Sequence, residues 1–191
     1  SASSRGVADF RGTPRYQVTL AASHFDLEKV QAGKVLRTDI NLAAQVDGSG
    51  TALADTNATG RVDWRPSVMG PVRINAGALR AFIARGSLTL SQLQFTAAGP
   101  TRIEARGQAV LSGQRLADVT YFLDCDDLGP WLTLAGRSGS GKLQVAGRAN
   151  GPLNDLLVRG NASVTAFKSG AVSIAGGQAN YYLNGVGGNA H

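Results

Sequence analysis

The stretch Ile40-Asn41-Leu42-Ala43-Ala44-Gln45-Val46 alternates between apolar residues and polar or small ones, and Gly48-Ser49-Gly50 follows it directly. Successive side chains of an extended chain point to opposite sides, so this stretch has one oily face and one wetter face. The glycines behind it are typical of a turn. The stretch therefore predicts a strand of a sheet that ends in a turn.

The same arrangement occurs again about 100 residues further along the chain. The first copy begins at Asp26-Leu27, and the second begins at Asp127-Leu128 and continues into Gly141-Lys142-Leu143-Gln144-Val145. We place these internal repeats at approximately 24–64 and 125–166. A repeated strand-and-glycine unit favours an array built by stacking. We therefore interpret residues 1–191 as a single elongated, β-rich fragment of a larger protein.

The composition agrees with many short strands. Apolar residues make up 43% of the chain, but only six Phe, four Tyr and two Trp are aromatic, and there are 25 Gly. Glycine weakens regular elements unless turns or close backbone approach need it, so long helices are not expected. The net charge of +6 comes from scattered residues, which favours a solvated basic face, with attraction to anionic lipid as the second interpretation.

Period-two alternation recurs along the whole chain, and turn signals such as Gly70-Pro71 and Gly99-Pro100 separate the segments. Two stretches, Asp26–Ala32 and Asp127–Ala135, read as short helical turns, each opening on an Asp suited to an N-cap. The predicted fold class is all-β: an elongated, curved antiparallel sheet with one or two helical turns. The pattern leaves open a sandwich, a closed barrel and an open gutter.

Two motifs suggest chemistry but lack its context. Gly136-Arg137-Ser138-Gly139-Ser140-Gly141-Lys142 matches a phosphate-binding loop, yet Leu143 replaces the required Ser or Thr and a strand pattern follows where a helix is needed. We interpret it as a hairpin loop. Asp124-Cys125-Asp126-Asp127 gathers carboxylates that neighbouring strand positions turn to opposite faces, so a polar strand end is favoured over a cation site, although a cation remains an open alternative.

Cys125 is the only cysteine, which rules out an internal disulfide. It could act as a nucleophile only beside a base, and the histidines are His24 and His191. We expect no enzyme, cofactor or metal, and no nucleic-acid partner, because basic residues are not interleaved with aromatic platforms. Trp64 closes a strand, either as a packed core residue or as a contact for lipid headgroups at the rim. No stretch reaches membrane-span length and no signal peptide opens the chain, so any anchor is expected outside it.

The residues quoted above resemble the bacterial TamB/AsmA-like superfamily. The resemblance covers roughly residues 16–175 and is most visible in Gly147-Arg148-Ala149-Asn150-Gly151-Pro152-Leu153 and in Leu157-Val158-Arg159-Gly160. It implies a hydrophobic half-pipe of stacked strands in the periplasm of Gram-negative bacteria, belonging to a parent protein anchored in the inner membrane. It also implies phospholipid transport between the two membranes and outer-membrane biogenesis, in some cases with a barrel partner in the outer membrane.

From the resemblance and the alternation, we expect a non-catalytic module whose groove binds and conducts phospholipid acyl chains. The alternative is a β-rich scaffold or chaperone that assists outer-membrane protein assembly by pairing strand edges. The residues expected to face the groove are Ile40, Leu42, Val46, Val62, Trp64, Val72, Ile74, Leu88, Leu90, Ile103, Leu111, Leu143 and Val145.

Overall fold

The computed structural model describes residues 1–26 and 37–186 of the chain, which form twelve strands and one short helix. The predicted all-β class is confirmed. In chain order the elements are β1 (Ala2–Asp9), β2 (Arg15–Phe25), β3 (Thr38–Ser49), β4 (Asn57–Trp64), β5 (Ser67–Met69), β6 (Val72–Ala84), β7 (Ser87–Ala97), β8 (Thr101–Val110), β9 (Leu116–Cys125), α1 (Gly129–Leu134), β10 (Ser140–Pro152), β11 (Leu156–Ser169) and β12 (Val172–Val186).

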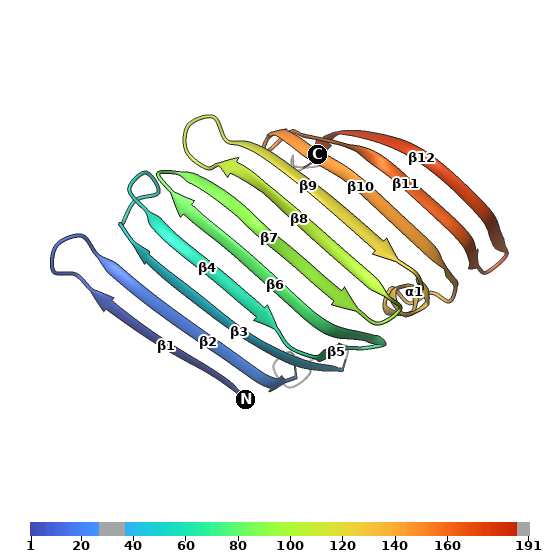
Figure 1. Cartoon of the computed structure of the whole chain (residues 1–191), viewed down its shortest axis with the longest axis horizontal. Coiled ribbons are helices and arrows are strands. Elements are labelled where there is room, and N and C mark those ends of the chain that lie inside the picture. The colour runs from blue at the N-terminus through green and yellow to red at the C-terminus, as the bar shows by residue number, and fades with distance from the viewer. Residues whose placement is uncertain (27–36, 187–191) are drawn as a thin grey trace.

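All the strands belong to one antiparallel sheet whose spatial order follows the order of the chain (Figure 1). The short β5 pairs with β3 and β6, the same two neighbours that β4 has. Strands β4 and β5 are therefore two pieces of one line, interrupted at Arg65-Pro66. Proline has no N–H to give to a ladder, which accounts for a break at this point. Figure 1 shows β10, β11 and β12 arching along their length.

Tight turns join the strands, and the sequence provides the residues they need. Between β6 and β7, Arg85 (φ 49°) and Gly86 (φ 76°) form a two-residue connection. Positive φ at both central positions is what a type I′ hairpin turn requires. A Cβ on Gly86 would lie 2.3 Å from the Ser112 hydroxyl, so glycine is also needed there for space.

Several strands contain irregularities that shift the phase of the alternation. In β2 the register slips between Ala22 and Phe25, where His24 has a φ of 50°. Strands β6 and β7 slip against their neighbours at two further places, beside Ile74 and between Leu90 and Leu93. An extra residue in one strand reverses the face of every side chain that follows it. These bulges therefore decide which residues share a face.

The predicted helical turn at Asp127–Ala135 is confirmed as α1, but its expected N-cap is wrong. Leu128 occupies the cap position without a side-chain bond, because Pro130 sets the first turn. Asp127 instead accepts a bond from the Gly129 N–H at 2.8 Å, one residue ahead of a true cap. The other predicted turn, Asp26–Ala32, lies outside the described residues beyond Asp26.

The buried core is small and lies mainly at one end of the central strands β6 to β9. Val72 and Cys125 are almost fully buried, and the other buried apolar residues of the described chain are Ile74, Ala97 and Ala117. The registers place Ile74, Ala97, Thr101 and Cys125 side by side on four successive strands. Helix α1 contacts β6 and β10 at the same end of the strands, so it covers this buried row. Within residues 1–26 and 37–186, no other helix or loop covers the rest of the sheet in this way.

Candidate functional site

The strand registers sort the side chains onto two faces of the sheet. Partners in an antiparallel pair point to the same side. Leu42 pairs with Trp64, Trp64 with Gly77, and Gly77 with Phe95. The row continues from Phe95 through Ile103, Leu123 and Val145 to Ala162. One line of apolar side chains and glycine thus crosses eight strands without a polar interruption.

Extending these pairings over all rows defines a surface that we call the apolar face. It consists of Ala2, Ser4, Gly6, Ala8, Tyr16, Val18, Leu20, Ala22, Phe25, Thr38, Ile40, Leu42, Ala44, Val46, Gly48, Ala58, Gly60, Val62, Trp64, Ser67, Met69, Val72, Ile74, Gly77, Leu79, Ala81, Ile83, Leu88, Leu90, Leu93, Phe95, Ala97, Thr101, Ile103, Ala105, Gly107, Ala109, Ala117, Val119, Tyr121, Leu123, Cys125, Leu143, Val145, Gly147, Ala149, Gly151, Val158, Gly160, Ala162, Val164, Gly177, Ala179, Tyr181 and Leu183.

None of the residues that make up the apolar face is charged. Charged residues make up 17% of the chain, and every Asp, Glu, Lys and Arg of the registered pairs of β1–β10 falls on the other face, as does Arg159 of β11. Lys168 of β11, which pairs with Ser140 and Ser173, follows Ala166 with its φ of 51° and lies beyond the rows that define the face. The polar side-chain groups on the apolar face are hydroxyls, one thiol and the indole N–H of Trp64.

The structure brings twelve of the thirteen expected groove residues onto this one face. Leu111 is the exception, because β8 ends at Val110 and Leu111 begins the following loop, where its N–H donates to the Gly86 carbonyl at 2.7 Å. Trp64 lies in the interior of the face, edge-to-face with Phe95 at 6.5 Å between ring centres. This is the packed arrangement and not the rim position.

Sequence reasoning left out several large side chains of the same face. Leu79, Leu93 and Phe95 lie beyond bulges, where a uniform alternation carried on from Ile74 or Leu90 puts them on the wrong side. The signal that could have found them is local: Leu93-Gln94-Phe95 alternates correctly once the count restarts after Ser91-Gln92.

Most of the apolar face has no second layer over it in the described structure. Val18 is 44% exposed, Val46 40% and Leu20 39%, although all three point to this face. Small residues deepen it locally, and a shallow hollow of about 240 Å³ lies among Leu143, Ala162, Val164, Ile174 and Ala179. Contiguous exposed apolar surface of this kind marks binding or interaction sites in soluble proteins.

One corner of the apolar face is closed by helix α1. The indole N–H of Trp131 donates to the Thr101 hydroxyl at 3.0 Å, and that hydroxyl lies 3.3 Å from the Cys125 thiol. The thiol in turn reaches the Asp127 carbonyl at 3.3 Å. These bonds satisfy the buried polar groups and fix the helix on the sheet. We call this region the capped corner.

Tyrosines lie over glycines on the apolar face. Tyr121 and Tyr181 belong to the ends of one row, Tyr121–Gly147–Gly160–Tyr181, and their hydroxyls meet at 2.7 Å. A Cβ on Gly147 would lie 2.5 Å from the Tyr121 hydroxyl, and one on Gly160 would lie 2.4 Å from the Tyr181 hydroxyl. Burial, with the bond to Tyr181, raises the pKa of Tyr121 to about 12. Tyr121 therefore stays neutral, and the bond between the two hydroxyls bridges the two intervening strands, β10 and β11.

The opposite face is polar and its charges pair with one another. Arg148 forms two bonds to Asp118, and the Lys142 ammonium lies 2.8 Å from Asp126. The hydrogen bond from Arg148 lowers the pKa of the Asp118 carboxyl, and the bond to Asp126 raises the pKa of the Lys142 ammonium. All four groups are well exposed, so this face is a solvated surface.

The two motifs that resembled chemical sites have structural roles in the described residues. The phosphate-loop lookalike follows α1 and leads into β10, so no helix begins where a phosphate would sit. Its lysine, Lys142, is paired with Asp126. Asp124 accepts from Gln144 at 3.1 Å and Asp127 from the Gly129 N–H, so the carboxylates point to separate partners. No metal-ligand cluster of three acidic, His or Cys residues occurs among them.

Cys125 and His24 are far apart. They lie at the ends of β9 and β2, six strand spacings from each other, or roughly 29 Å at ~4.8 Å per strand. The thiol is 1% exposed, whereas the His24 side chain is largely exposed and pairs with Asp39. The two side chains cannot form a nucleophile and base.

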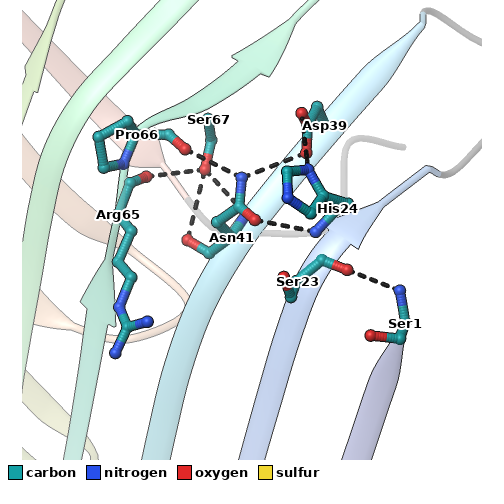
Figure 2. A network of polar contacts seen from close by, with 8 residues as sticks. All are labelled: Ser1, Ser23, His24, Asp39, Asn41, Arg65, Pro66 and Ser67. Atoms are coloured by element: carbon teal, nitrogen blue, oxygen red, sulfur yellow. Dashed lines mark hydrogen bonds and ion pairs between the residues drawn. The ribbon is translucent and has the colours of Figure 1, made fainter.

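His24 belongs to a polar network at the edge of the opposite face, shown in Figure 2. Asn41 accepts from the His24 backbone N–H at 2.8 Å and donates to the Pro66 carbonyl at 2.9 Å. The Ser67 hydroxyl bonds the backbone of Asn41 and Arg65 and does not reach the imidazole. Asn41 thus satisfies backbone groups at the β2 bulge and at the β4–β5 break, which is a structural task.

The fold and face therefore define an all-β meander with one apolar surface that is mostly uncovered in the described structure. Comparison of the chain with protein-family models, curated proteins and solved structures found no match. Among the described residues, the one helix is too short to cross a membrane.

Proposed function

We propose that the apolar face binds the acyl chains of phospholipid, with the headgroups held at the wet edges of the sheet, and that the module is non-catalytic. The observation that carries this proposal is the absence of charge on a large, mostly uncovered face of the described sheet. Acyl chains need continuous apolar contact and nothing else, since they have no groups to pair.

The hydrophobic effect favours contact between the lipid and the apolar face along its whole length and at no single fixed position. Burial of apolar surface contributes ~25 cal/mol per Å², so a two-chain lipid lying on such a face gains several kcal/mol without a polar anchor. Rows of similar apolar side chains follow one another from β2 to β11, and no fixed charge along them holds the lipid at one position. A chain bound there can move from row to row across the strands.

The resemblance to the TamB/AsmA-like superfamily extends this proposal to the whole protein. In that extension the sheet is a segment of a curved half-pipe in the periplasm, the parent protein is anchored in the inner membrane, and phospholipid passes between the inner and outer membranes. An outer-membrane barrel is the proposed protein partner.

The experiment uses two matched pairs of substitutions that place the same charge on opposite faces. Val145→Asp and Leu20→Asp charge the apolar face, whereas Ala146→Asp and Ala21→Asp charge the polar face one residue away. Native mass spectrometry after incubation with palmitoyl-oleoyl phosphatidylglycerol reports lipid adducts. We expect the first two variants to lose most of the adduct and the controls to keep it.

Leu20 is 39% exposed, so Leu20→Asp tests the proposal even if Val145→Asp disturbs folding, which circular dichroism would show. Equal amounts of lipid adduct on all four variants, or no adduct on the unaltered protein, would contradict the proposal.

A second candidate is a scaffold whose outer strands pair with the strands of client proteins. The observation in its favour is that β1 and β12 each have one partner strand in the described sheet. This function predicts binding of an unfolded outer-membrane β-protein that Val145→Asp leaves intact and that needs no lipid.

A further inference from the structure

A line of arginines crosses the polar face, the side of the sheet opposite to the apolar face. We call it the arginine row, and it consists of Arg61 of β4, Arg80 of β6, Arg106 of β8, Arg148 of β10 and Arg159 of β11. Arg61 lies directly opposite Arg80. Thr120 pairs with both Arg106 and Arg148, and Arg148 lies directly opposite Arg159. The row therefore runs across the strands and not along one of them.

Only part of the charge of the row is neutralised within the sheet. Asp63 forms an ion pair with Arg80. Asp118 forms one with Arg148. Among residues 1–26 and 37–186, no carboxylate pairs with the other three members, which we call the unpaired arginines: Arg61, Arg106 and Arg159. The row therefore keeps a net positive charge.

Two of the unpaired arginines face another arginine. Arg61 lies opposite Arg80, and its guanidinium donates to the neutral side chain of Gln45. Arg159 lies opposite Arg148. Like charges directly opposite each other destabilise a sheet. A bound carboxylate would offset this repulsion, because it accepts two parallel hydrogen bonds from a guanidinium.

The unpaired arginines are evenly spaced. The strand order puts three strand spacings between Arg61 and Arg106, and three more between Arg106 and Arg159. Each interval is therefore ~14 Å at ~4.8 Å per strand. Four residues of an extended peptide also span ~14 Å, at ~3.4 Å per residue, and residues four apart point to the same side. An extended peptide with an acidic residue at every fourth position matches this spacing.

The middle of the row is hollowed. The bulge in β7 places Ser91 and Gln92 beside Arg106. Two adjoining hollows of about 430 and 480 Å³ share Ser91, Arg106 and Thr120 in their linings. The hydroxyls of Ser91 and Thr120 donate to carbonyls of the sheet, so their oxygens can still accept from a peptide N–H.

Acidic residues border the row on both sides along the strands. Asp47 and Asp118 lie on one side, each two residues from a member of the row or its paired neighbour. Asp63 and Glu104 lie on the other side. A flat anionic membrane would meet these carboxylates as well, whereas a single extended chain lies along the row alone. Nucleic acid is disfavoured, because the row includes no aromatic ring on which a base could stack.

From the spacing, the unpaired charge and the bordering acids, we propose that the arginine row binds an extended acidic segment of a partner protein, with carboxylates at every fourth residue. This inference goes beyond lipid binding, because it uses the opposite face of the sheet. Val145→Asp, which charges the apolar face, should therefore leave peptide binding unchanged.

The test is fluorescence anisotropy of labelled nine-residue peptides, titrated with the full chain at low ionic strength. The matching peptide has glutamates at its first, fifth and ninth positions and serine or threonine elsewhere. The control peptide has the same composition, with the middle glutamate moved to the fourth position, where it points to the opposite side. We expect the matching peptide to bind at least about fivefold more tightly.

A matched pair of substitutions tests the role of the row. Arg106→Gln removes its central charge and should weaken binding of the matching peptide by at least about tenfold. Arg73→Gln removes the same charge from the polar face outside the row and should change binding by less than about twofold. Both arginines are exposed, so the fold should be retained, which circular dichroism checks.

Three results would overturn the inference. They are no binding of the matching peptide, equal affinity for the two peptides, and equal weakening by the two substitutions, which would mean attraction by net charge alone. In the first case, vesicles of palmitoyl-oleoyl phosphatidylglycerol and a thymidine oligonucleotide serve as further probes. Binding of either one that Arg106→Gln weakens would assign the row to a membrane surface or to nucleic acid instead.

Discussion

The capped corner and the open part of the apolar face have the same kind of side chains but different surroundings. At the capped corner, Val72 is fully buried and Thr101 is 3% exposed beneath α1. On the open part, Val18 points to the same face and remains 44% exposed. The difference indicates that the side chains of the corner contribute more to stability, whereas those of the open part remain accessible to solvent.

The largest expected effect contrasts one valine from each region. Val72→Ala removes two fully buried methyl groups and should lower the free energy of unfolding by about 2–3 kcal/mol. Val18→Ala should cost less than about 1 kcal/mol, because solvent already reaches that side chain. Urea unfolding followed by circular dichroism measures both. Equal losses would remove the distinction between the two regions.

The next effect compares two glycines of the apolar face, one beneath the Tyr121–Tyr181 hydroxyl bond that crosses β10 and β11, and one in open space. Gly147→Ala puts a Cβ 2.5 Å from the Tyr121 hydroxyl and 2.7 Å from the Arg159 carbonyl. We expect a loss of about 1–3 kcal/mol from this overpacking. Gly60→Ala is the control on the same face, since the nearest atoms to its Cβ are 4.0 Å away. Thermal melting that lowered the midpoint of both variants alike would contradict the account.

A smaller effect concerns alkaline pH. The folded protein holds Tyr121 neutral up to a pKa of about 12, whereas the ordinary tyrosine pKa is 10.0. The unfolded chain therefore loses this proton first, and the stability contributed by Tyr121 falls as pH rises from 10 toward 12. Ultraviolet difference titration of the protein against Tyr121→Phe should show a phenolate step near pH 12. A step near pH 10 would mean that the bridge is open.

The smallest effect lies on the polar face, away from both regions. Arg148→Gln removes the hydrogen bond that lowers the pKa of Asp118, so that pKa should rise toward its ordinary value of 3.8. A lowered carboxylate pKa contributes stability above pH 3.8, and this contribution is lost as pH falls through the folded-state pKa. NMR titration of the Asp118 carboxyl measures the shift. Overall stability near pH 7 should change little, because the pair is exposed.

Alternation along the chain was enough to predict the antiparallel β class and to choose side chains that share one face. It worked because most strands are regular, so Ile40, Leu42 and Val46 keep one phase from end to end. It failed where a bulge adds a residue, as before Leu93, because backbone irregularity depends on both strands of a pair and not on one sequence segment.

The capped corner could be predicted only in part. The helical turn was visible from Asp127–Ala135, but its position over Thr101 depends on how β8 and β9 align. The indole bond of Trp131 joins residues thirty positions apart and has no local signal. Burial of Cys125 is likewise a result of the helix lying above it.

The strand order, which repeats the order of the chain, also has a consequence for folding. Each strand of the described sheet finds its partners among its immediate neighbours in sequence, with β5 completing the line of β4. Most connections are short, and the longer ones, at 26–37 and 126–139, still join strands that are neighbours in the sheet. We therefore expect assembly to spread from any early hairpin in both directions, without waiting for distant parts of the chain to meet.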